Sequence, residues 1–260
     1  MKGQYKKLAL LNTLGFIAVG IINSMANGLP INGFTTGELS AFYPNLFVPA
    51  GITFSIWGVI YSTLIFFLIY QWAVKDPIKQ QPIEKIGYWF VISCIANCCW
   101  IIIWHYRITS LSVLIMLVLL YSLITIYKQL HQDRDESTKT PITTKLFVYI
   151  PFSLYLGWVS VATIANITAL CVDLGWDGSP LSEATWASLM IIIALMLALR
   201  FLLLQKDIFF ALSIGWALAG ILVRRMNDEE PLFSIIMTAN AGVLLITFGI
   251  ILQLVRRKFY

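Results

Sequence analysis

The stretch LFVYIPFSLYLGWVSVATIANITALC, residues 146–171, decides the class of fold, because it contains no Asp, Glu, Lys, Arg or His. A helix needs about 20 such apolar residues to cross the hydrocarbon core of a bilayer. Seven further windows of the chain meet this requirement. The complete set covers residues 8–26, 49–73, 86–106, 108–128, 146–171, 183–204, 208–225 and 232–255. The sequence therefore predicts an all-α integral membrane protein with eight transmembrane helices.

The composition of the chain excludes a soluble domain that carries a membrane anchor. Hydrophobic residues make up 59% of the 260 residues and charged residues 12%, whereas an ordinary soluble domain has roughly 25% charged residues. No connection between two windows is longer than about twenty residues, which is too short for a folded extramembrane domain.

Lysine and arginine are concentrated on one side of the predicted helices. With the N terminus inside, the inner segments, including the loop 129–144 and the C-terminal end, hold 15 of the 18 basic residues. The outer segments hold only Arg107, Arg224 and Arg225. Because basic residues are retained preferentially on the cytoplasmic side, we expect both termini to be cytoplasmic, in the inner membrane of a bacterium. The basic excess then reflects topology, and no nucleic-acid partner is expected.

The first window also resembles a signal peptide. Lys2, Lys6 and Lys7 precede an apolar stretch that ends in Ser24-Met25-Ala26, a pattern similar to a cleavage site. Cleavage would remove residues 1–26; we interpret this segment as the first transmembrane helix.

The apolar centres of the windows contain no Asp, Glu or Lys. Proton-coupled carriers usually need a carboxylate at membrane depth, and a retinal protein needs a lysine there. His105 and His131 are the only histidines; a haem ligand at His105 is one interpretation, and an interfacial histidine with a water or backbone partner is the other. The sequence therefore predicts neither catalytic residues nor a metal site.

Three windows carry aromatic and amide side chains along one helix face, at spacings of three and four residues. Amides at membrane depth need hydrogen-bond partners and should face other helices or a cavity. Tryptophan and tyrosine rings beside such amides suit a planar, hydrophobic ligand. The predicted site residues are Trp57, Tyr61, Asn97, Trp100, Trp104, Tyr155, Trp158, Ala162 and Asn166.

Two long connections lie on the predicted outer side. The segment from Asn27 to Phe47 carries no Lys or Arg, and we expect it to cover the pocket as a lid. The segment from Val172 to Ser182 contains Trp176 and Asp177, which suit a membrane–water interface.

The aromatic stripes resemble motifs of the tryptophan-rich sensory protein family, also called TspO/MBR or the translocator protein family. The resembling segments are WGVIYS at residues 57–62, NCCW at 97–100 and YLGWVSVATIAN at 155–166. The chain departs from the family motifs at Gly51, Ser55, Leu154 and Leu170. The resemblance covers residues 8–171. It implies a five-helix bundle in residues 1–171, followed by three additional transmembrane helices in residues 172–260.

The resemblance also implies a function. We expect a membrane receptor or carrier that binds a hydrophobic, planar small molecule, such as a porphyrin or another tetrapyrrole, haem included. A lipid- or sterol-like ligand, contact with membrane lipid and a homodimer are further expectations. An enzyme that degrades or photo-oxidises a bound tetrapyrrole and a small-molecule transporter are the alternatives. The sequence shows no acid–base pair or nucleophile for conventional catalysis, which argues against an enzyme. The enzyme stays an alternative because photo-oxidation would not need such groups.

Overall fold

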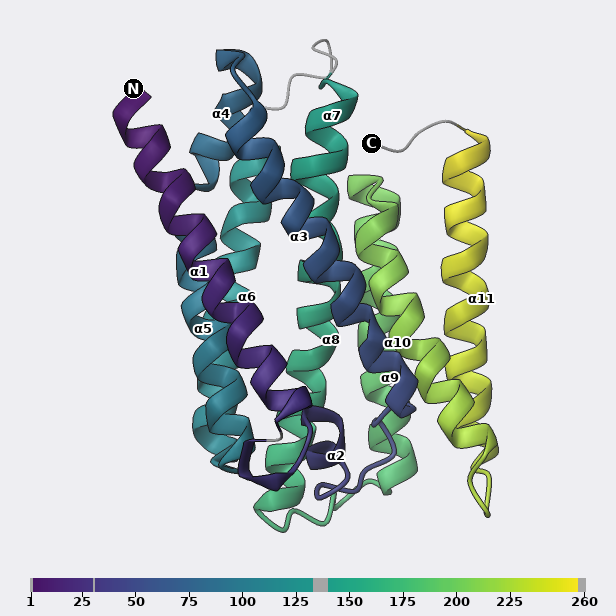
Figure 1. Ribbon diagram of the computed structural model, residues 1–260. Coiled ribbons are helices and arrows are strands. Elements are labelled where there is room, and N and C mark those ends of the chain that lie inside the picture. The colour runs from purple at the N-terminus through teal and green to yellow at the C-terminus, as the bar shows by residue number, and fades with distance from the viewer. Residues whose placement is uncertain (1, 30, 133–139, 257–260) are drawn as a thin grey trace. The chain divides into compact units, whose positions relative to one another are not determined.

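The computed structural model describes residues 2–29, 31–132 and 140–256 (Figure 1). Within these ranges every regular element is a helix, so the prediction of an all-α protein is confirmed. Part of the inner loop and of the basic C-terminal end lies outside the described residues. These positions include Arg134, Glu136, Lys139, Arg257 and Lys258.

Among the described residues, seven helical segments are long and apolar enough to cross a membrane, and the number rises to eight if a bent pair of helices counts as one span. Seven of the predicted windows coincide with such a segment, and the third does so only as part of the bent pair. The side on which each terminus lies stays a prediction. The first half of the chain contains α1 (Lys2–Gly28), η1 (Ile31–Gly33), α2 (Thr36–Ser40), η2 (Gly51–Ser55), α3 (Ile56–Ala73), α4 (Pro77–Ile86), α5 (Trp89–His105) and α6 (Thr109–His131). The second half contains α7 (Ile142–Thr144), η3 (Lys145–Tyr149), α8 (Ile150–Asp173), α9 (Glu183–Arg200), η4 (Phe201–Gln205), α10 (Ile208–Met226) and α11 (Phe233–Val255).

The third predicted window, residues 86–106, coincides with α5, which forms the bent pair with α4; the axes of the two helices differ by 44°. Helix α4 begins where the side chain of Asp76 accepts a hydrogen bond from the backbone N–H of Ile78, with Pro77 in the first turn. It ends at Gly87, whose φ of 55° lies in the left-handed region that favours glycine. The bend therefore follows from local sequence at both ends of α4.

The chain forms two compact units, which are described separately. Unit 1 consists of Met1–Thr36 and Trp57–Leu156, and unit 2 of Gly37–Ile56 and Gly157–Tyr260. The boundary falls inside α8, so this helix contributes residues to both units. The predicted division into 1–171 and 172–260 rests on family resemblance instead of contacts, and it stays a prediction.

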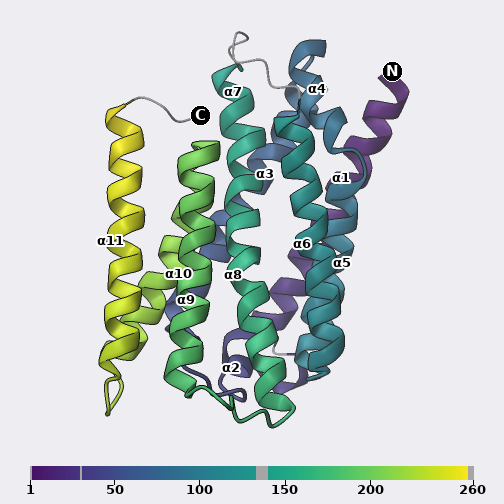
Figure 2. The same ribbon diagram turned by 180° about the vertical axis from the view of Figure 1, so that it is seen from behind.

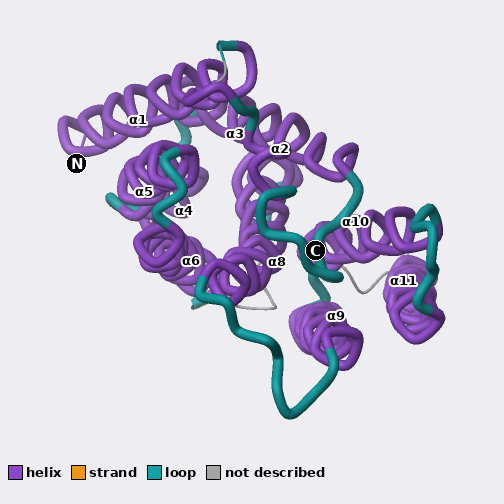
Figure 3. The backbone as a smooth tube through the Cα atoms, turned by 90° about the horizontal axis from the view of Figure 1, so that it is seen from below, coloured by secondary structure: helices purple, strands orange, loops and turns teal. Residues whose placement is uncertain are grey.

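Unit 1 is held together around a cluster of phenylalanine rings. Helix α1 packs along α5, and α5 along α6 (Figures 1 and 3). Phe67 of α3, Phe90 of α5 and Phe152 of α8 contact one another edge to face, with ring centroids 5.1 to 5.5 Å apart. Such pairs stabilise a core beyond their buried area. The cluster joins three helices at one level.

In unit 2, the helices α9, α10 and α11 pack against one another, and α10 also contacts η2 (Figure 2). The indole N–H of Trp216 donates to the backbone carbonyl of Thr53 at 2.8 Å. The backbone N–H of Ala50 donates to the carbonyl of Gly220 at 3.0 Å. The segment before α3 is therefore fixed onto α10 within this unit.

Replacing Trp216 by phenylalanine is expected to lower the free energy of unfolding by about 1 kcal/mol, because the carbonyl of Thr53 loses its indole donor. Reversible unfolding in mixed detergent micelles measures the change. The matched control is Phe248→Leu, an exposed apolar position in the same unit, which should have little effect. Equal stabilities for the Trp216 variant and the natural chain would contradict a stabilising hydrogen bond from Trp216 to Thr53.

Candidate functional site

Four helices of unit 1 bring two amides and two phenol groups to one point. The Tyr61 hydroxyl of α3 donates to Oδ1 of Asn23 of α1 at 3.1 Å. Nδ2 of Asn23 donates to Oδ1 of Asn97 of α5 at 2.9 Å. Nδ2 of Asn97 donates to the hydroxyl of Tyr155 of α8 at 3.2 Å, and it lies 3.5 Å from the hydroxyl of Tyr61. The side chains thus form a closed polar network.

The network explains why these residue types occur in apolar helices. Asn97 is 0% exposed, and an unpaired amide at membrane depth would be costly. Each polar group of Asn97 finds its partner on a different helix, so the network fixes the spacing of the helices that carry it. It also orients the aromatic rings beside it.

Trp57 borders this network on α3. Its ring centroid lies 5.3 Å from that of Tyr61 and 6.0 Å from that of Tyr155, the latter edge to face. Phe16 of α1 lies edge to face against Tyr61 at 6.0 Å. We call the five residues Asn23, Trp57, Tyr61, Asn97 and Tyr155 the amide–aromatic cluster. Trp57 and Tyr61 are half-buried and the rest of the predicted members are buried, so the cluster presents aromatic surface as well as polar groups.

Trp100 and Trp104 continue the stripe on α5 and are both buried. Their rings stack at 6.1 Å with an angle of 18° between the planes. The indole N–H of Trp104 donates to the carbonyl of Thr36 at 3.4 Å. The indole N–H of Trp100 has no hydrogen-bond partner among the described residues. An unpaired buried donor of this kind costs about 1–3 kcal/mol, so it marks a place where an acceptor would be favourable.

His105 lies at the end of the same helix and is fully buried. Its Nδ1 is 2.7 Å from the carbonyl of Ile101, which agrees with the expectation of a backbone partner and makes Nδ1 the donor. Its Nε2 has no partner among the described residues. No three His, Cys, Asp or Glu side chains of the described ranges come together as a metal site. The haem interpretation of His105 stays a prediction.

The other three predicted residues, Trp158, Ala162 and Asn166, lie in the part of α8 that belongs to unit 2. Trp158 is buried and contacts Phe54 edge to face at 6.2 Å. Asn166 is also buried, and Ala162 is half-buried. The structure therefore brings Trp57, Tyr61, Asn97 and Tyr155 together, places Trp100 and Trp104 next along α5, and assigns the last three residues to unit 2.

Asn23 is the member that the sequence analysis missed. It lies in the first window, whose flanking lysines and small residues are also typical of a signal peptide. An amide in an otherwise apolar helix could have indicated Asn23, and Asn12 of the same window is a second such amide. Asn12 is indeed buried and donates to Oε1 of Gln71 at 3.1 Å.

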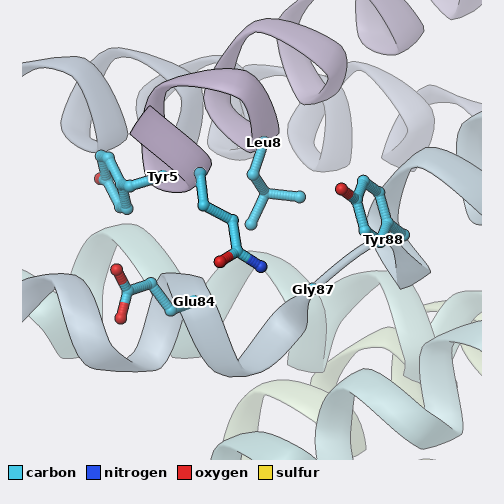
Figure 4. A pocket seen from close by; sticks show the side chains of 6 residues that line it. Tyr5, Leu8, Glu84, Gly87 and Tyr88 are labelled. Atoms are coloured by element: carbon cyan, nitrogen blue, oxygen red, sulfur yellow. The ribbon is translucent and has the colours of Figure 1, made fainter. Parts of the chain in front are cut away.

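A small cavity lies elsewhere in unit 1, between α1 and α4, and Figure 4 shows Tyr5 and Leu8 facing Glu84 and Tyr88. Its volume is about 160 Å³. Pockets for small-molecule ligands usually measure about 300–1,000 Å³. This cavity can hold a few waters and is too small for a planar ring system.

The apolar spans and the buried polar network define a multi-pass helical membrane protein. The family model described as TSPO-like protein matches residues 9–252, and the chain belongs to this family. The match confirms the resemblance seen in the motifs and extends through α9 and α10 into α11. Searches of curated proteins and of solved structures gave no significant match.

Proposed function

We propose that this protein binds a hydrophobic, planar small molecule, such as a porphyrin or another tetrapyrrole, at the amide–aromatic cluster of unit 1. One observation carries the proposal: two amides and two phenols from four helices meet beside the half-buried indole of Trp57. Membership of the TSPO-like family favours a small hydrophobic ligand in general. That this ligand is a tetrapyrrole is the more specific part of the proposal.

The chemistry of the cluster suits a flat ligand with a few polar substituents. The ring of Trp57 offers stacking area, and the network holds the ring of Tyr61 beside it. Trp100 lies three residues after Asn97 on the same helix and supplies the unpaired indole N–H. A carboxylate or carbonyl of the ligand would satisfy that donor. The cluster therefore combines apolar contact with a small number of directional contacts.

Replacing Trp57 by phenylalanine is expected to weaken porphyrin binding about fivefold, because the smaller ring loses stacking area against the ligand. The affinity is measured by titrating the detergent-solubilised protein with a porphyrin and following the porphyrin absorption band. Trp72→Phe is the matched control, since Trp72 lies on the same helix and is 51% exposed. Its affinity should equal that of the natural chain.

Two results would overturn the proposal. One is a porphyrin titration that does not saturate, because the porphyrin then only partitions into the detergent micelle. The other is an equal affinity for the Trp57 and Trp72 variants, which would remove the cluster from the site. A homodimer, the bacterial inner membrane and bound lipid stay predictions.

A further inference from the structure

Unit 2 contains a larger cavity, of about 580 Å³, which lies within the usual range for small-molecule pockets. Its walls come from three segments of this unit: the loop residues 44–47, the end of α8 and the beginning of α9. The connection between α8 and α9 closes one side. None of the nine predicted site residues lines it, so it is separate from the site proposed above.

Apolar side chains form most of the wall, among them Phe47, Ile167 and Met190. Two indoles stand at one side: the ring centroids of Trp176 and Trp186 lie 5.0 Å apart, with 59° between the planes. The indole N–H of Trp186 donates to the carbonyl of Gly178 at 2.5 Å, which fixes the orientation of that ring. The two tilted rings, which we call the aromatic corner, therefore border the apolar part of the cavity.

The charge of the lining is negative. Asp177 and Glu183 are both lining residues, and no described Lys, Arg or His is among them. One oxygen of Asp177 accepts the backbone N–H of Ser179 at 2.9 Å, which leaves the other oxygen for a ligand. Glu183 is the first residue of α9, where a carboxylate is favoured by the helix dipole. Arg225 interacts electrostatically with Glu183, but its guanidinium pairs with Asp228 at 2.8 Å.

We propose that this cavity binds an amphipathic organic cation: a quaternary or tertiary ammonium group attached to a compact apolar body. An ammonium group is attracted to indole faces and to carboxylates together, and an aromatic corner is the arrangement by which proteins recognise quaternary ammonium. The apolar body fits among Phe47, Ile167 and Met190. Two sources share this chemistry, a free organic cation and the choline headgroup of a phospholipid.

The test is equilibrium binding of radiolabelled benzyltrimethylammonium to the full chain in a nonionic detergent. We expect saturable binding whose affinity falls about tenfold when both acids are neutralised in the double variant Asp177→Asn/Glu183→Gln. Both substitutions keep the size of the side chain, and asparagine keeps the oxygen that accepts from Ser179. Trp186→Leu should lower the affinity by about the same factor, because it removes one face of the aromatic corner.

Three controls separate this site from its surroundings. Glu230→Gln neutralises an acid of unit 2 outside the cavity and should leave the affinity unchanged. Trp57→Phe should leave it unchanged as well, so the porphyrin site and the cation site fail or succeed independently. Neopentylbenzene has the same shape without the charge, and it should not compete.

Competition then distinguishes the two sources. Displacement by choline chloride identifies a free cation, whereas displacement only by short-chain phosphatidylcholine below its micelle concentration identifies a lipid headgroup. Either result supports the proposal. It is overturned if benzyltrimethylammonium does not saturate, if the double variant binds as well as the natural chain, or if Glu230→Gln weakens binding equally.

Discussion

Replacing Asn97 by leucine is expected to lower the free energy of unfolding by about 2–3 kcal/mol. The leucine can neither accept from Asn23 nor donate to Tyr155. The phenol of Tyr155 and the amide of Asn23 then lose a partner inside apolar helices, where no water replaces it. Reversible unfolding in mixed detergent micelles measures the loss. The variant should also lose porphyrin affinity, because the network that orients Tyr61 is broken.

The control for this prediction is Asn27→Leu. Asn27 is an exposed amide at the end of the same α1 that carries Asn23, and it donates locally to the carbonyl of Asn23. Its replacement should change stability by less than about 0.5 kcal/mol. A double variant with Tyr155→Phe should lose less than the sum of the two single losses, since both act on one hydrogen bond. Strict additivity would show that the network is not a unit.

The variant Gly157→Ala is expected to cost about 3 kcal/mol or more, because α8 and α10 are in close contact at this glycine. A Cβ atom at this position would lie 2.5 Å from the backbone carbonyl oxygen of Phe210 and 3.0 Å from Cβ of Ser213. A backbone oxygen cannot turn aside as a flexible side chain can. The helices must therefore move apart within unit 2. Small residues at such contacts are typical of helix pairs in membranes.

Gly58→Ala is the matched control for Gly157→Ala. Gly58 also lies in a transmembrane helix, and a Cβ atom there would meet nothing within 4 Å. Its replacement should leave stability unchanged or raise it by about 0.5–1 kcal/mol, since glycine is a poor helix former. The same unfolding assay compares the two variants. Equal stability of both would contradict the close contact between α8 and α10.

The transmembrane helices were predictable because their signal is local. Length and hydrophobicity alone separate the windows. Seven of them coincide with a helical segment long and apolar enough to cross a membrane, and the third coincides with α5 of the bent pair. The bend between α4 and α5 was missed, although Pro77 and Gly87 are both local signals. Pro77 lies between two apolar windows and Gly87 at the start of the second, and a count of apolar residues gives neither of them any weight.

The candidate site was predictable only in part, because its contacts are tertiary. Tyr61, Asn97 and Tyr155 were predicted from spacing and family resemblance, but the partner that joins them, Asn23, comes from a helix without a motif. The cavity of unit 2 was missed for a similar reason. Trp176 is in a segment assigned to the membrane interface, and Trp186 is in a helix without a recognisable pattern. Only folding places their rings side by side.

The most direct test of the central claim is photoaffinity labelling with a porphyrin that carries a diazirine, followed by mass spectrometry of the labelled peptides. Binding at the amide–aromatic cluster predicts saturable labels on α1, α3 and α5 close to Asn23, Trp57 and Asn97, and excess unlabelled porphyrin should abolish them. Labels spread over exposed apolar residues such as Phe66, Ile69 and Leu244, and unaffected by unlabelled porphyrin, would contradict the claim.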